Sequence, residues 1–117
     1  MMQLPDLKSL SSASTVRTYP VTAQDLARAT QEAVRNLPGW KVKHATDTEI
    51  RAVRRTRLFA FVEDITVRLA QGQSGASTNT RISFISASRA GLWDLGQNRR
   101  NLDELLAAMD QQLTTEG

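Results

Sequence analysis

Residues 40–69 read WKVKHATDTEIRAVRRTRLFAFVEDITVRL, a stretch in which apolar and polar side chains repeatedly alternate. The pattern is clearest near its end, where Ile65, Val67 and Leu69 are separated by polar residues. Successive side chains of a strand point to opposite faces of a sheet, so this alternation predicts strands that bury one face. We therefore predict three strands, over residues 40–44, 49–56 and 64–69.

Helical periodicity lies on both sides of these strands. Residues Thr22–Leu37 carry apolar side chains three and four positions apart, Thr22 and Asp25 nearly form a capping box, and Pro38 follows the last residue. Residues Leu95–Leu113 form the second such segment, which Asp94 and Gln97 cap in the same way. Its apolar stripe consists of Leu102, Leu105, Leu106, Met109 and Leu113.

Two further strands complete the predicted architecture: Thr15–Tyr19 before the first helix and Arg81–Ser86 after the loop 71–79. The order is then strand, helix, four strands, helix. Strands joined by short turns run antiparallel. We therefore expect an α+β two-layer sandwich, in which a curved antiparallel sheet carries both helices on one face.

The 117 residues suffice for one domain, which we place at residues 15–117 after a flexible leader, residues 1–14. There is no cysteine and a single histidine, His44, which excludes disulfides and thiolate metal sites and makes a zinc site improbable. We expect no metal and no cofactor. No apolar run is long enough to span a membrane and no secretory signal opens the chain, so we expect a soluble cytoplasmic protein.

The charge composition is mildly basic, with a formal net charge of +3, and 12 of the 15 basic residues are arginine. Arginine forks onto carboxylates and phosphates, so this bias indicates either internal ion pairs or a face that binds anions. The run Arg51, Arg54, Arg55 and Arg57 could meet nucleic acid phosphates. Interleaved acidic residues and few aromatic ones argue against that interpretation.

Two blocks of sequence carry a more specific pattern, RLFAFVED at residues 57–64 and SASRAGLWDLGQNRR at residues 86–100. Together they resemble the signature of the bacterial and plastid domain of unknown function family 1499. The positions that match are Arg57, Phe59, Phe61, Asp64, Ser86, Ser88, Arg89, Gly91, Asp94, Gly96 and Asn98. Ile85 departs from it, because an arginine is expected there. The resemblance implies a fold but no catalytic residues, since the activity of the family is unassigned.

A structural role explains the whole motif. Arg89 follows a strand and could hold Asp64 or Asp94 with paired hydrogen bonds, thereby locking the corner between the last strand and the last helix. Ser86 and Ser88 can bond to local backbone where the strand ends.

A binding role uses the same polar residues, which would converge near the first turn of the last helix, where free amides attract phosphate or carboxylate. The candidate ligand-binding residues are Arg57, Asp64, Ser86, Ser88, Arg89, Asp94, Asn98 and Arg100. On this hypothesis the chain is a non-catalytic module whose sheet and long helix enclose an apolar groove with arginines at its mouth. It would take a small anionic or amphipathic ligand or a protein partner.

Two alternatives remain open, a purely structural or interaction domain and a small enzyme that uses Asp64 and Arg89. Hydrolysis through a nucleophile needs a histidine base and a suitable turn, and His44 alone does not supply them. Glu63 and Asp64 are adjacent on a strand, so they should point to opposite faces and cannot act together. We therefore assign no catalytic residue and expect a protein that is not an enzyme.

Overall fold

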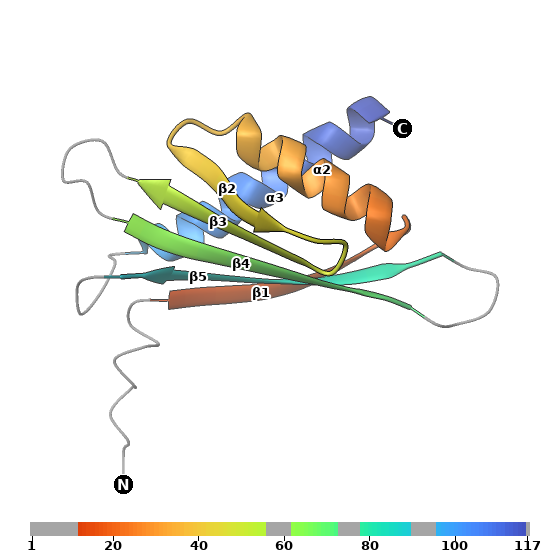
Figure 1. The fold of residues 1–117 in the computed structure, drawn as a ribbon, viewed down its shortest axis with the longest axis horizontal. Helices are drawn as coiled ribbons and strands as arrows, with labels where there is room; N and C mark the ends of the chain where they lie inside the picture. Colours follow the sequence, from red (N-terminus) through yellow and green to blue (C-terminus); the bar gives the residue numbers. More distant parts are fainter. Residues whose placement is uncertain (1–11, 56–61, 73–77, 90–95, 117) are drawn as a thin grey trace, which may run out of the picture.

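The computed structural model describes residues 12–55, 62–72, 78–89 and 96–116, which form one five-stranded sheet and two helices (Figure 1). In chain order these are β1 (Ser12–Tyr19), α2 (Ala23–Arg35), β2 (Trp40–Ala45), β3 (Glu49–Arg55), β4 (Val62–Gln71), β5 (Thr80–Ser88) and α3 (Gln97–Glu116). The strands lie in the order β1-β5-β4-β3-β2, and every neighbouring pair is antiparallel. The predicted α+β class and element order are confirmed.

Both helices pack on the same face of the sheet, as predicted (Figure 1). Helix α2 contacts β2, β3 and β4, whereas α3 contacts β1 and β5 and lies against α2. None of the described helices is long and apolar enough to cross a membrane.

Element ends differ from the predictions where backbone pairing extends beyond the apolar pattern. Strand β1 begins at Ser12 rather than Thr15, because Ser12 and Ser14 pair with Ala87 and Ile85 of β5 although their side chains are polar. Antiparallel pairing uses backbone groups, so polar side chains at a sheet edge do not end a strand. Helix α3 begins at Gln97 rather than Leu95 and continues to Glu116.

The core fills the space between the sheet and the helices. Ile65, Val67 and Leu69 of β4 are buried as predicted, and Thr22 caps α2 by accepting a hydrogen bond from the Asp25 amide at 3.1 Å. The largest fully buried apolar side chains are Phe84, Leu26, Ile50, Ile65, Ile82, Leu102, Leu105, Met109, Val34 and Val67. The prediction of an apolar groove between the sheet and the long helix is wrong for the described residues, because core side chains fill the space between them.

The opposite face of the sheet, here called the outer face, is covered by neither helix. Strand alternation sends every second side chain to it. The cross-strand register places these residues there: Lys41, Glu49, Arg51, Val53, Arg55, Asp64, Thr66, Arg68, Arg81, Ser83, Ile85, Ala87, Arg89 and, on β1, Ser14, Val16 and Thr18.

Candidate functional site

The residues predicted to form one site separate into two groups on opposite faces of the sheet. Ser86, Ser88, Asn98 and Arg100 lie on the helix side, whereas Asp64 and Arg89 lie on the outer face. The cause is strand alternation, which turns Ser88 and Arg89 to opposite faces although they are adjacent. Two further predicted site residues, Arg57 and Asp94, lie outside the described residues, as does the Asp94 half of the predicted capping box.

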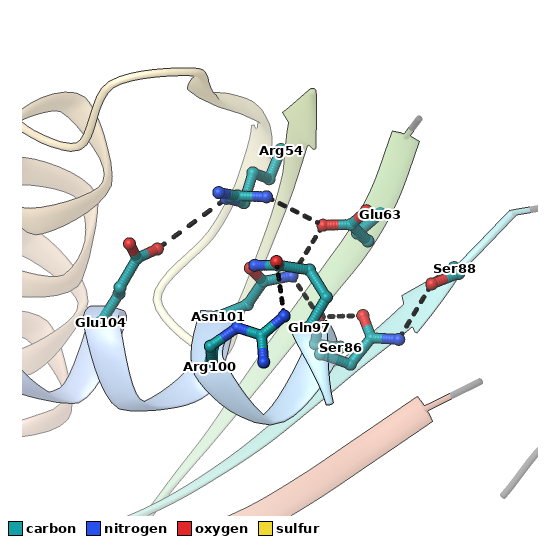
Figure 2. A network of polar contacts seen from close by, with 9 residues as sticks. Arg54, Glu63, Ser86, Ser88, Gln97, Arg100, Asn101 and Glu104 are labelled. Carbon is teal, nitrogen blue, oxygen red and sulfur yellow. Dashed lines mark hydrogen bonds and ion pairs between the residues drawn. The ribbon is translucent and has the colours of Figure 1, made fainter. Parts of the chain in front are cut away.

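On the helix side, amide and hydroxyl groups form a chain of hydrogen bonds (Figure 2). Ser86 Oγ donates to Asn98 Oδ1 at 2.7 Å, and Asn98 Nδ2 donates to Ser88 Oγ at 2.9 Å. Asn101 Nδ2 donates both to Ser86 Oγ at 3.2 Å and to Glu63 Oε1 at 2.9 Å. Ser86, Asn98 and Asn101 are fully buried, so these contacts take the place of water.

The network ends in charged groups at its solvent side. Arg54 Nη1 donates to Glu63 Oε1 at 3.3 Å, and Arg54 Nε lies 3.8 Å from Glu104 Oε2. The Glu63 side chain is only 4% exposed. Gln97 Nε2 donates to Asn101 Oδ1 at 2.8 Å, and Arg100 Nη2 donates to Gln97 Oε1 at 3.1 Å, which completes the set in Figure 2.

This arrangement joins β3, β4 and β5 to the first turns of α3. Buried polar groups that are paired cost little, whereas removing one partner leaves the other desolvated and unpaired. The helix-side half of the predicted site therefore supports the structural interpretation of the motif. Sequence reasoning missed Glu63, Asn101 and Arg54. The available signal was the pair Asn98 and Asn101, which lie one helical turn apart beside the apolar stripe of α3.

A second polar contact between the sheet and α3 lies farther along the helix, at Asp110. Tyr19 Oη donates to Asp110 Oδ1 at 3.1 Å and so connects β1 to α3. Burial, followed by the nearby Asp110 carboxylate, raises the pKa of Tyr19 to about 12. The phenol is thus held in its protonated, hydrogen-bonding form.

On the outer face, Arg89 and Asp64 form a paired contact. Arg89 Nε donates to Asp64 Oδ2 and Nη2 donates to Oδ1, each at 2.8 Å, and these bonds raise the pKa of Arg89 above its usual value. The predicted contact between the two residues is therefore confirmed. It lies on the face away from α3, however, so the prediction that it seats the last helix is wrong; the helix-side network does so instead.

A second carboxylate on the outer face is shared by two arginines. Arg51 Nε lies 2.8 Å from Glu49 Oε1, and Arg68 Nε lies 3.4 Å from Glu49 Oε2. The hydrogen bond from Arg68, followed by that from Arg51, lowers the pKa of Glu49. Both carboxylates of this face thus already accept hydrogen bonds from arginine.

Basic side chains outnumber these carboxylates on the outer face. Among the described residues of the face, the basic ones are Lys41, Lys43, Arg51, Arg55, Arg68, Arg81 and Arg89, against Glu49 and Asp64, while Asp47 lies in the turn between β2 and β3. A depression of about 280 Å³ lies among them, lined by Lys43, Arg51, Ala52, Val53, Asp64, Ile65, Thr66 and Arg89.

Exposed apolar side chains lie on the same face. Val16 and Ile85 are each 43% exposed, and the register of β1 with β5 makes them diagonal neighbours, since Val16 pairs with Ser83 and Ile85 with Ser14. A second depression, of about 450 Å³, lies elsewhere, between the end of α2 and α3. Among the described residues, no cluster of three or more His, Asp and Glu side chains is placed to hold a metal ion.

Similarity to solved structures concerns the fold. A crystal structure of protein MLL2253 from Mesorhizobium loti is 11% identical, with a TM-score of 0.62 over 91% of this chain and 98% of that one. A crystal structure of TTHA0849 from Thermus thermophilus is 10% identical, with a TM-score of 0.46 over 91% and 99%. No curated protein matches the sequence.

The family suggested by the sequence motif is confirmed along almost the whole chain. Residues 5–109 match the family described as protein of unknown function (DUF1499). This range spans both sequence blocks, and with them the helix-side network and the Arg89–Asp64 pair. The chain therefore belongs to the DUF1499 family.

Proposed function

We propose that this chain is a non-catalytic binding module that engages an acidic partner protein on the outer face of its sheet. The observation that carries the proposal is the charge imbalance of that face, where, in the segments that the structure describes, seven basic side chains accompany two acidic ones. Five of the seven are arginines, whose planar groups pair with carboxylates in a fixed geometry. An acidic surface on the partner would supply the carboxylates that these basic side chains lack on their own face.

The form of the face favours a protein as the partner. Protein interfaces typically have an apolar centre, an enrichment in arginine and a polar rim. Here Val16 and Ile85 lie among small side chains, with Arg81 and Arg89 toward the two ends of β5. The described part of the face carries no Phe, Tyr or Trp on which nucleic acid bases could stack, which argues against a nucleic acid partner.

The proposal moves the binding site from the position expected beside α3. Ser86, Ser88 and Asn98 are engaged with one another and with Asn101, so we assign them to the stability of the fold. Asp64 and Arg89 remain in the binding face. A cytoplasmic location is part of the proposal, because a cysteine-free chain is compatible with a reducing compartment.

The enzyme alternative is supported less well. A catalytic carboxylate must be able to exchange a proton with its substrate. Both oxygens of Asp64 accept hydrogen bonds from Arg89, so this carboxylate is already engaged. A purely structural domain remains the alternative, and the helix-side network is the observation that favours it.

The test compares two double variants with the same formal net charge. Lys41→Glu with Arg81→Glu reverses two cations of the outer face, and Arg28→Glu with Arg35→Glu reverses two on the exposed side of α2. Each pair lowers the net charge from +3 to −1. Poly-L-glutamate serves as the acidic probe. We expect salt-sensitive binding by the wild-type chain, a loss of about tenfold in the outer-face variant and a clearly smaller loss in the α2 variant. Equal losses in the two variants would contradict the proposal.

A further inference from the structure

We propose that the depression in the outer face binds one carboxylate carried on a short aliphatic chain. The inference deepens the proposed function and rests on it, because it identifies the chemical group that the face recognises. The side chains that carry it are those of Lys43, Arg51, Val53, Asp64, Thr66 and Arg89.

The charges around the depression are net positive. Its lining contains Lys43, Arg51 and Arg89 against the single carboxylate of Asp64, and the neighbouring Glu49 is shared between Arg51 and Arg68. Asp64 pairs with Arg89, and Glu49 pairs with Arg51, but among the described residues no carboxylate pairs with Lys43. A bound carboxylate would reduce this excess of positive charge.

Donors for such a group are present and held in position. Glu49 engages Nε of Arg51, so both terminal nitrogens of Arg51 can donate to a ligand. Asp64 accepts from Nε and Nη2 of Arg89, which fixes the position of that guanidinium and leaves Nη1 to donate. The Thr66 hydroxyl lies in the same lining. The existing ion pairs thereby orient the donors before a ligand arrives.

The depression also has an apolar part, which selects an organic acid over a bare anion. Val53 contributes the apolar side chain, whereas Ala52 and Ile65 turn their side chains into the core and line the depression only with backbone. Its volume of about 280 Å³ is just below the range typical of drug-sized ligands, so a short chain fits better than an extended cofactor. The ligand group can come from two sources, a glutamate or aspartate side chain of a partner protein or a free short-chain acid.

The test follows backbone amide shifts in NMR titrations with three probes: acetyl-Gly-Glu-Gly-amide, glutarate and inorganic phosphate. We expect saturable shifts at Val53 and Thr66 with the peptide. Lys43→Gln with Arg51→Gln should raise the Kd about tenfold. Arg28→Gln with Arg35→Gln removes the same charge from the exposed side of α2 and should leave the Kd nearly unchanged. Far-UV circular dichroism checks that both variants remain folded.

The outcomes separate the two proposals. Binding of the peptide supports a partner side chain as the source, and binding of glutarate alone supports a free acid and counts against a partner protein. Phosphate binding as tight as that of either organic acid, or no saturable binding by the organic acids, would overturn the inference. If the acids fail while poly-L-glutamate still distinguishes the outer face from α2, the depression is wrongly assigned and the proposed function stands.

Discussion

The two faces of the sheet differ sharply in how their charges are used. On the helix side and on the helices, the described basic residues Arg17, Arg28, Arg35, Arg54, Arg99 and Arg100 are outnumbered by seven acidic ones, Asp25, Glu32, Glu63, Asp103, Glu104, Asp110 and Glu116. On the outer face, seven basic side chains accompany two carboxylates. Within the described part of the chain, the positive charge is therefore concentrated on the face that neither helix covers, which a net charge alone does not reveal.

Two adjacent residues show the same contrast at the scale of single contacts. The Glu63 side chain is 4% exposed and accepts from Asn101 and Arg54, whereas the Asp64 side chain is 45% exposed and accepts from Arg89. A buried carboxylate that loses its partners is costly, whereas exposed ion pairs contribute little, because water and salt screen them. We therefore expect the helix-side group to contribute much more to the stability of the fold than the exposed pair of the outer face.

The largest effect is expected from Glu63→Ala. It removes the carboxylate that the buried Asn101 amide and the partly buried Arg54 share, which leaves them the longer contacts to Ser86 Oγ and Glu104, and we expect a loss of about 3 kcal/mol in the free energy of unfolding. Urea denaturation followed by circular dichroism measures it. Asp64→Ala is the matched control on the other face and should cost much less. If the two variants are equally destabilised, the contrast between the faces is not one of stability.

A smaller loss is expected from Asn98→Ala. Ser86 and Ser88 lose their shared partner, and a cavity forms under α3, so we expect about 2 kcal/mol by the same measurement. The exposed neighbour Arg99→Ala is the control and should change the stability by less than about 0.5 kcal/mol. Comparable losses at the two positions would show that the network does not seat α3.

A spectroscopic test addresses the helix side separately. Tyr19 is the only tyrosine, so absorbance near 295 nm reports its ionisation alone, and we expect a midpoint near pH 12 in the folded protein. Asp110→Asn should move the midpoint down toward 10, the unperturbed value. Because folding raises this pKa, its stabilising contribution is complete below about pH 10 and disappears as the pH rises through about 12. An unchanged midpoint in Asp110→Asn would show that the contact of Tyr19 with Asp110 does not form.

The smallest effect is expected from Glu49 on the outer face. Its pKa is lowered by Arg68 and Arg51, so its contribution to stability is present above the unfolded pKa of 4.5 and is lost as the pH falls through the lower folded value. Urea midpoints of Glu49→Gln and wild type should therefore converge in acid. A gap that persists at the lowest pH would show that Glu49 acts through packing rather than charge.

Local patterns predicted most of the fold. The alternation in β4 and the apolar stripe of α3 identified Ile65, Val67, Leu102 and Met109 as buried, and all are. The candidate site was predicted less well. The predicted site combines Ser88 with Arg89, although strand alternation places these neighbours on opposite faces of the sheet, as it does Glu63 and Asp64. Asn101 was missed because its partner Glu63 is 38 residues away in the chain.

The amino-acid sequence by itself determined which side of each helix and strand is buried, because the periods of 2 and 3.6 residues follow from backbone geometry within a few neighbouring residues. Only the tertiary structure decided which polar groups meet and where the basic residues gather. The strand order β1-β5-β4-β3-β2 and the register bring Arg89 to Asp64 and place the cations of four strands on one face. Such contacts depend on strands that pair across long stretches of chain, and local periodicity carries no information about that pairing.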